Sequence, residues 1–224
     1  MKPTPSSVQP STAPLRGRLN TFQRTMLDWN DLHPYNAVHV VHFAPLPDLS
    51  RLRQAIQTTL AFHGLTRLTL GGKRRTFTYA GGQTSCELTV LEGDNPQELL
   101  RAEIERQINT PFDCHGAFEP FRFFVVRDGA GCYLGLVYFH AVADAVSIVR
   151  LLRHIHGTLT GNSPSSETPV RLLRDRSRLQ PWSLLRKLKA FAGKLWHHRH
   201  SVRVAHRDVF DGRNRYEMLS LDAS

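Results

Sequence analysis

The residues best placed to do chemistry are His140, which ends an apolar run, and Asp144, which follows four positions later. Residues 133 to 139 are aromatic, aliphatic or β-branched with one glycine, which predicts a buried strand. Apolar residues then recur at helical spacing, which predicts a helix over 145–157 with Asp144 at its N-cap. A neutral imidazole on the loop between them can take a proton from a hydroxyl, an amine or a thiol.

The spacing alone leaves the role of each residue open. A histidine that ends a strand can be a general base or an ordinary structural residue. Asp144 is too close in sequence to need to touch the imidazole ring, so its carboxylate can cap the helix or pair with an arginine. Either contact would hold the loop in shape.

Four segments, in the same order along the chain, resemble the condensation-domain and chloramphenicol-acetyltransferase-like acyltransferases. Residues 139–145 (FHAVADA) keep the second histidine and the aspartate of the family's H-H-x-x-x-D-G loop. Residues 19–27 (LNTFQRTML) are similar to its opening L-T-x-x-Q-x-x-L segment, and residues 48–67 to the helix that runs into R-H-x-x-L-R. Residues 109–123 resemble its N-x-P-F-D-L … P-L-x-R-x segment.

The resemblance implies an α/β (α+β sandwich) fold, namely one lobe of a chloramphenicol-acetyltransferase-like fold, with helices packed on a mixed sheet of about five strands. It implies transfer of an acyl group from a CoA or carrier-protein thioester to a hydroxyl or amine acceptor, with His140 as general base. It implies no bound metal or redox cofactor. In the family the aspartate is structural and pairs with an arginine, so Arg67 is the candidate partner of Asp144, and Arg24 is a weaker one.

The sequence departs from the family at several points, among them Phe62, Gly64 and Thr66 in the R-H-x-x-L-R segment. Phe139 replaces the first histidine of the loop. Ala145 replaces the glycine that permits a close backbone turn, so we expect its Cβ to constrain that turn. The D-F-G-W-G motif of the family's second lobe is absent from the sequence. We therefore expect a fragment, one half of an enzyme that a second lobe completes in trans, or a lobe that no longer catalyses.

The chain divides into four parts by composition. We expect a disordered Pro/Ser-rich leader over 1–18, the acyltransferase-like lobe over 19–160, a basic amphipathic segment over 161–210, and over 211–224 the start of a strand towards a second lobe. Within the lobe, patterning predicts strands at 38–43, 76–79, 87–91, 121–126 and 133–139. It predicts helices at 49–62, 96–109 and 145–157.

The positive charge is concentrated near the C-terminus. Residues 171–207 hold eleven Lys or Arg against one acidic residue, a net charge equal to the +10 of the whole chain. Apolar residues recur there at helical spacing beside a basic surface made of Arg186, Lys187, Lys189 and Lys194. This pattern indicates a segment that connects lobes, a helix on a membrane surface, or a docking face for an acidic carrier protein or the phosphates of CoA.

Other functional classes have weaker support. The histidines between 197 and 206 have no cysteine or carboxylate at ligand spacing, so we predict no metal site, and we find no nucleic-acid-binding motif. Three scattered cysteines, no membrane-spanning run and no signal-peptide core predict a cytoplasmic protein, with the basic segment as a route to peripheral attachment at a membrane. The alternative function is a non-catalytic lobe that binds a membrane surface or an acidic partner through this segment.

Overall fold

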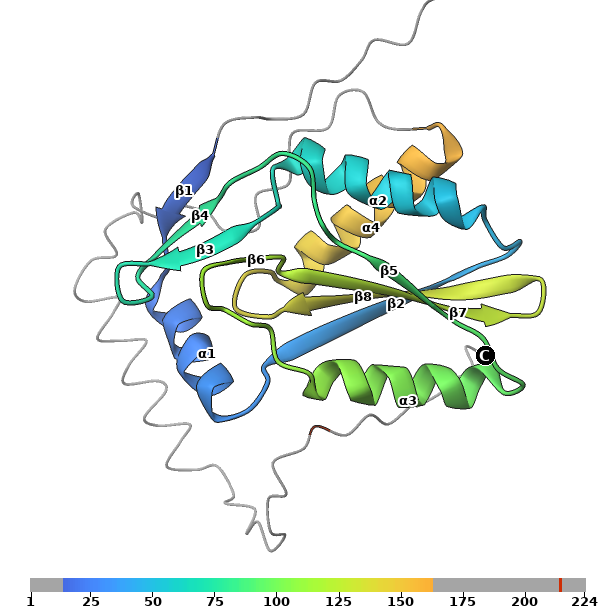
Figure 1. Cartoon of the computed structure of the whole chain (residues 1–224), viewed down its shortest axis with the longest axis horizontal. Coiled ribbons are helices and arrows are strands. Elements are labelled where there is room, and N and C mark those ends of the chain that lie inside the picture. The colour runs from blue at the N-terminus through green and yellow to red at the C-terminus, as the bar shows by residue number, and fades with distance from the viewer. Residues whose placement is uncertain (1–13, 163–213, 215–224) are drawn as a thin grey trace, which may run out of the picture.

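The computed structural model describes residues 14–162 and Asn214, which form two four-stranded sheets and four helices (Figure 1). The strands are β1 (Leu15–Arg18), β2 (Asn36–Phe43), β3 (Leu68–Gly71), β4 (Thr76–Tyr79), β5 (Leu88–Leu91), β6 (Ala117–Phe118), β7 (Phe121–Asp128) and β8 (Gly131–Phe139). The helices are α1 (Thr21–Leu32), α2 (Leu49–His63), α3 (Pro96–Asn109) and α4 (Ala145–Thr160). The α/β class expected from the sequence is confirmed.

The larger sheet has the strand order β2-β8-β7-β5 and carries most of the core. β8 pairs antiparallel with β2 and β7, and β5 pairs parallel with β7. Gly135 of β8 lies opposite Phe124, and a Cβ at position 135 would lie 2.1 Å from the Phe124 ring. The glycine is therefore required so that this ring can lie across the central strand.

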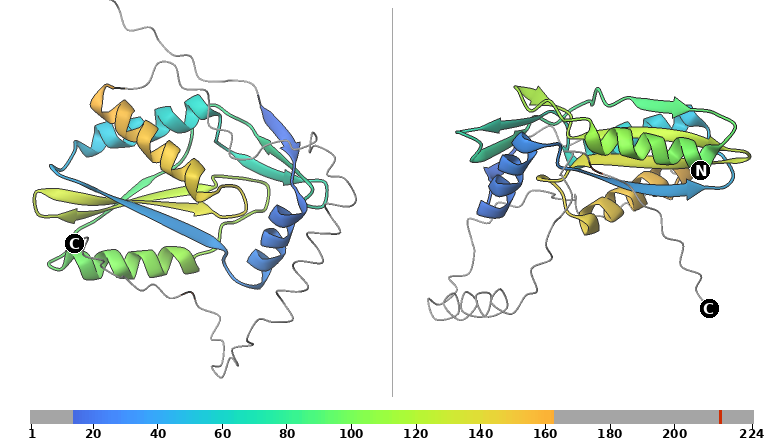
Figure 2. Two further views of the ribbon diagram at one scale, coloured as in Figure 1. Left: turned by 180° about the vertical axis from the view of Figure 1, so that it is seen from behind. Right: turned by 90° about the horizontal axis from the view of Figure 1, so that it is seen from below.

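Helices cover both faces of the larger sheet. Figures 1 and 2 show α3 on one side of the strands and the packed pair α2 and α4 on the other. Each helix begins at a side-chain cap: Asp48 for α2, Asn95 for α3 and Asp144 for α4. The helices predicted from spacing are confirmed, with α2 one residue and α4 three residues longer than expected.

The smaller sheet, of order β1-β4-β3-β6, is a difference from the single sheet of about five strands expected. Its strand β1 lies inside the range 1–18 that the sequence assigned to a disordered leader. A strand of only four residues is too short for its alternating exposure to be recognised in the sequence. Its backbone groups form their strand hydrogen bonds with β4, which only the folded chain brings beside it. β3, β6 and α1 were also not predicted.

Asn20 begins α1 with a capping box. Its side chain accepts from the Gln23 N–H at 2.9 Å, and the Gln23 side chain accepts from the Asn20 N–H at 2.9 Å. Along the chain, α1 follows β1 of the smaller sheet and precedes β2 of the larger one. Tyr35, directly before β2, lies next to the end of β8.

The basic surface of Arg186, Lys187, Lys189 and Lys194 lies outside the described residues, as do the histidines between 197 and 206. The same holds for the proposed segments 161–210 and 211–224, apart from 161, 162 and Asn214. Across residues 14–162 the helices are all too short or too polar to cross a bilayer.

Candidate active site

His140 is the first residue after β8, one of the two inner strands of the larger sheet. Its backbone N–H donates to the Tyr35 carbonyl at 3.2 Å, so the end of β8 is tied to the start of β2. Its Nδ1 lies 3.2 Å from the Ala143 carbonyl oxygen. Because that oxygen can only accept, Nδ1 carries a proton, and in the neutral form of this partly exposed residue Nε2 keeps its lone pair.

Two tyrosines hold the imidazole from different sides. The Tyr35 ring stacks on it at 5.3 Å between centroids and 17° between planes, and the Tyr138 ring meets it edge-on at 5.7 Å. Tyr35 is itself fixed, because its N–H donates to Asn30 Oδ1 at 3.0 Å and its ring packs on Trp29. The imidazole therefore has a defined orientation, and no carboxylate within residues 14–162 pairs with its ring.

A second histidine, His39 of β2, belongs to the same cluster. Its ring lies 5.7 Å from that of Tyr138. Burial lowers the pKa of His39, and repulsion from His140, when that ring is protonated, lowers it further. Burial raises the pKa of Tyr138 to about 12, and the Asp144 carboxylate raises it as well. Both side chains therefore stay neutral near pH 7.

Asp144 is the N-cap of α4, as its position in the sequence predicted. Its Oδ1 accepts from the Ser147 N–H at 2.8 Å, and its carbonyl accepts from the Ile148 N–H at 3.1 Å. Ala145 is the first residue of α4 and is exposed, and it is not one of the residues with positive φ. The expectation that its Cβ would constrain the turn is therefore wrong, since a helical backbone at this position suits alanine.

Arg67 does not form the ion pair with Asp144 that the family resemblance implies. Among the ion pairs within residues 14–162, none joins Arg67 to Asp144. Arg67 is exposed, its N–H donates to Glu119 Oε2 at 3.3 Å, and its carbonyl accepts from the Ala80 N–H at 3.2 Å. Arg24, the weaker candidate partner, lines a pocket between α1 and the β3–β4 turn.

The segment 109–123 stabilises the end of α3 beneath the site. The half-buried Arg122 guanidinium donates to the carbonyls of Gln107 and Thr110 at 3.1 and 2.8 Å, and it lies 4.1 Å from the centre of the Phe112 ring. Burial lowers the pKa of Arg122 to about 10. Segment 109–123, which resembles a family motif, therefore caps the C-terminal end of α3, because Arg122 donates to the carbonyls there.

Asn109 of the same motif anchors a distant part of the chain. Its Nδ2 donates to the Asn214 carbonyl at 3.0 Å, and its Oδ1 accepts from the Asn214 N–H at 2.9 Å. Asn214 Nδ2 in turn donates to the carbonyls of Pro34 and Ile108. The chain therefore returns beside Pro34, next to Tyr35, within the segment 211–224 that was expected to lead to a second lobe.

The sequence identified His140 and Asp144 but missed Tyr35, Tyr138 and His39. One signal was available for Tyr138, since alternate residues of a strand share a face and Tyr138 is two residues before His140. Tyr35 and His39 could not be found in this way, because the register of β2 against β8 brings them to the site. Within residues 14–162, no group of three or more histidine, cysteine or acidic side chains is placed to hold a metal ion.

Solved structures with the same arrangement of elements are condensation domains. The first condensation domain of the calcium-dependent antibiotic synthetase, in complex with a substrate analogue, matches with a TM-score of 0.64 at 15% identity over 83% of this chain and 48% of its own. A mutant starter condensation domain of the rhizomide synthetase RzmA, in complex with C8-CoA and Leu-SNAC, matches with a TM-score of 0.63 at 15% identity over 84% and 46%. The fold is condensation-like. The tallysomycin biosynthesis protein TlmII also matches this condensation-like fold, with a TM-score of 0.60 at 19% identity over 83% and 45%.

This condensation-like chain spans about half the length of the structures it matches. Their identities of 15 to 19% support a shared fold. No protein-family model matches the sequence, and no curated protein matches it. The family expectation drawn from four short motifs is therefore confirmed for the fold by structural likeness.

Proposed function

We propose that this chain provides the part of a condensation-like acyltransferase that carries the general base. The observation that carries the proposal is the bond from Nδ1 of His140 to the Ala143 carbonyl, which leaves Nε2 of this partly exposed residue as an acceptor. The donor is an acyl thioester of CoA or of a carrier protein, and the acceptor is a hydroxyl or an amine. The likeness to a condensation domain bound to C8-CoA and Leu-SNAC supports an acyl-CoA donor and an amine acceptor.

In the proposed step, Nε2 of His140 takes a proton from the acceptor as the acceptor attacks the thioester carbonyl. A new carbon–nitrogen or carbon–oxygen bond forms and the carbon–sulfur bond breaks. The proton passes from the imidazolium to the thiolate, which leaves as a thiol. Tyr35 keeps the ring in place through its stacking contact. No bound cofactor is needed for this chemistry.

Asp144 and Arg67 are proposed to support the loop and take no part in proton transfer. Asp144 does so as the cap of α4. Arg67 is proposed to do so at the start of β3, where its N–H donates to the Glu119 carboxylate and its carbonyl accepts from the Ala80 N–H. A second lobe, in a longer polypeptide or in another chain, would close the substrate channel. We propose a cytoplasmic location for the reaction.

The test is acyl transfer by the full chain with C8-CoA as donor and Leu-SNAC as amine acceptor, followed by mass spectrometry of the N-acylated product. The chain is assayed alone and together with the polypeptides encoded beside it. We expect His140→Ala to lower the rate by at least ~100-fold, the contribution typical of a general base. His115→Ala, which removes an exposed histidine outside the cluster, is the matched control.

An unchanged rate in His140→Ala with an unchanged melting temperature would refute the proposed role of His140. An absence of product under all these conditions, with other acyl-CoA and carrier-bound donors also tried, would refute acyl transfer itself.

The charge of residues 171–207 favours a second candidate function, a non-catalytic lobe that binds a membrane surface or an acidic partner. Binding to anionic vesicles or to an acidic carrier protein should then survive His140→Ala. It should weaken strongly when Arg186, Lys187, Lys189 and Lys194 are all changed to glutamine, since attraction to an anionic surface contributes about 1 kcal/mol per basic residue. Binding that persists in this variant would exclude an electrostatic mechanism.

A further inference from the structure

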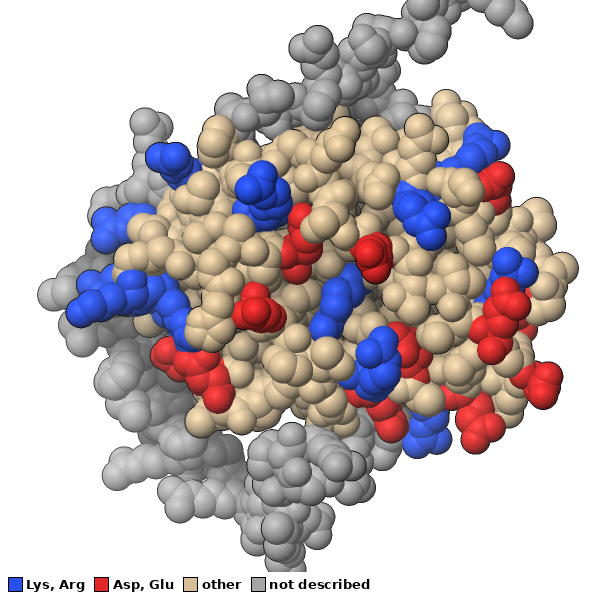
Figure 3. Space-filling view, viewed as in Figure 1, with Lys and Arg blue, Asp and Glu red and all other residues tan. Residues whose placement is uncertain are grey.

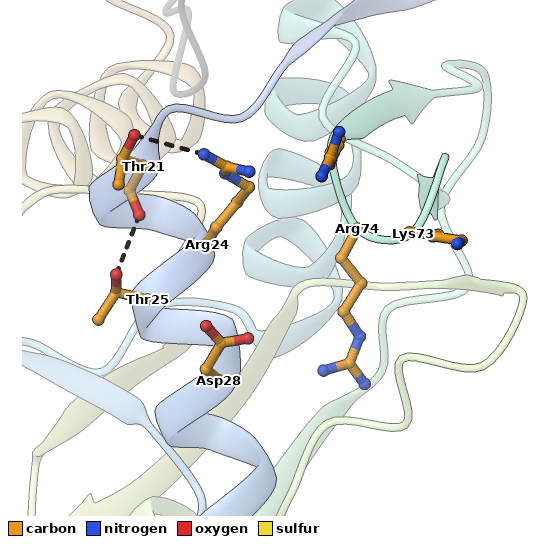
Figure 4. A pocket seen from close by; sticks show the side chains of 7 residues that line it. Thr21, Arg24, Thr25, Asp28, Lys73 and Arg74 are labelled. Carbon is orange, nitrogen blue, oxygen red and sulfur yellow. Dashed lines mark hydrogen bonds between the residues drawn. The ribbon is translucent and has the colours of Figure 1, made fainter.

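A basic pocket of about 350 Å³ lies between α1 and the turn that joins β3 to β4, and none of the residues around His140 lines it. Figure 4 shows the Arg24 guanidinium reaching from α1 toward the gap, while the Arg74 side chain extends alongside the helix from the facing turn. Lys and Arg side chains gather at this edge of the molecule (Figure 3). The lining residues are Thr21, Arg24, Thr25, Asp28, Lys73, Arg74 and Arg75.

Backbone contacts hold the two walls of the pocket together. The Leu19 N–H donates to the Arg75 carbonyl at 2.9 Å, directly before the cap of α1. The antiparallel pair of β1 and β4 ends there, with Arg18, the last residue of β1, opposite Thr76, the first residue of β4. The Arg75 N–H closes the turn onto the Gly71 carbonyl at 3.0 Å. The basic side chains therefore extend from a wall that is fixed relative to α1.

Most of the positive charge in the pocket is uncompensated. Arg74 is ion-paired with Asp31, but Arg24, Lys73 and Arg75 form no ion pair with an acidic residue of the described part of the chain. Asp28 is the one carboxylate among the lining residues. Three cations thus face one anion.

Arg24 in particular has unused hydrogen-bonding capacity. Within the described residues its guanidinium makes one side-chain bond, from Nη2 to Thr21 Oγ1 at 3.4 Å, and its Nε is buried without an acceptor. An unsatisfied buried donor is costly, so an arginine in this position is normally matched by an acceptor. Thr21 Oγ1 accepts this bond, which leaves its own hydroxyl proton to donate into the pocket.

The local backbone adds to the positive potential. The first turn of α1 contains no acidic residue, so the partial positive charge of the helix start is not offset there.

The turn between β3 and β4 has an unusual backbone. Gly72, Lys73 and Arg74 all have φ between +55° and +58°, a left-handed conformation that residues with a Cβ seldom adopt. The turn nevertheless carries two basic residues where glycine or asparagine would be favoured.

We propose that this pocket binds the phosphate group of a phosphorylated small molecule. A phosphate dianion offers enough charge and enough oxygens to accept from the guanidinium of Arg24, from Arg75 and from the Thr21 hydroxyl together. A single carboxylate would leave a positive excess. The site goes beyond the proposed acyl transfer and does not depend on His140.

The test is isothermal titration of the full chain at low ionic strength with inorganic pyrophosphate and, separately, with CoA. We expect Arg24→Gln and Arg75→Gln each to weaken pyrophosphate binding about tenfold, the loss of one charge-assisted hydrogen bond. Lys73→Asn removes a charge while suiting the left-handed backbone, and it should weaken binding without lowering the melting temperature. Arg53→Gln, which removes an exposed arginine of α2, should bind as the wild type does.

Two outcomes separate the sources of the phosphate. Equal affinity for pyrophosphate and CoA would support a site for free phosphate groups, and tighter binding of CoA with the same losses in the variants would support a CoA-type ligand. Binding of neither probe, or binding that Arg24→Gln, Arg75→Gln and Lys73→Asn leave unchanged, would overturn the proposal. So would a loss in Arg53→Gln as large as theirs.

Discussion

Nδ1 of His140 lies 3.2 Å from the carbonyl oxygen of Ala143, three residues further along the same loop. A carbonyl oxygen accepts and never donates, so this contact selects the tautomer with the proton on Nδ1. The backbone of the loop therefore prepares Nε2 as a base. The Asp144 carboxylate is engaged instead with the first turn of α4.

The tautomer of His140 can be measured directly. In a long-range proton–nitrogen correlation spectrum at pH 8, its Nδ1 should have the shift of a protonated ring nitrogen and its Nε2 that of an unprotonated one. The signal that disappears in His140→Ala identifies the residue. A protonated Nε2 would contradict the contact with Ala143.

Asp144 should act chiefly as a helix cap. Asp144→Ala should cost about 1 kcal/mol of unfolding free energy, and Asp144→Asn should cost less, because asparagine also caps a helix. Asn95→Ala removes the corresponding cap of α3 and is the matched control, with a similar loss. Denaturant unfolding gives these values. A loss in Asp144→Asn equal to that in Asp144→Ala would show that the charge, and not the cap, is what stabilises the loop.

Gly135→Ala should be among the most destabilising small substitutions in the sheet. Its Cβ would lie 2.1 Å from the Phe124 ring, which packs in a core without spare room, so we expect a cost of about 3 kcal/mol in unfolding free energy. Gly116→Ala, at a φ of +75° with nothing within 4 Å, should cost only about 1 kcal/mol. Adding Phe124→Leu to Gly135→Ala should recover part of the loss. If the two glycine variants were equally stable, the close packing at Gly135 would be wrong.

His63 should make the fold sensitive to acid. Burial between α2 and α4 lowers its pKa to about 4, and the nearby charge of His154 adds to the shift. Above about pH 6.5 the imidazole is neutral in both states and has no effect on stability. As the pH falls from 6.5 to 4 the unfolded chain takes up the proton first, so up to about 3 kcal/mol of stability is lost over this window.

The measurement is the free energy of unfolding at pH 7 and pH 4 for the wild type and for His63→Gln. The variant should lose less stability between the two values than the wild type does. His115→Gln, at an exposed position, should behave as the wild type. An identical pH dependence in wild type and His63→Gln would exclude His63 as the source.

Local features of the sequence were sufficient to predict three helices, five strands and the junction at His140. Asp144 caps the helix that its position predicts, and the helices predicted to start at 49 and 96 begin directly after Asp48 and Asn95, which cap them. Caps and apolar spacing act within a few residues, so they can be read without knowing the fold. By contrast β1 and β3 are short and partly polar, and each becomes a strand only because β4 pairs with both.

The sequence by itself determined the α/β class, a histidine at the end of a buried strand and an aspartate that caps the next helix. Only the tertiary structure decided what surrounds that histidine. Tyr35 stacks on it and His39 joins the cluster because β2 pairs with β8 in one register. It also decided that Arg67 lies against Glu119 and that Arg24 faces the β3–β4 turn. Such contacts join residues far apart in the chain, and their geometry depends on how strands pair and helices pack.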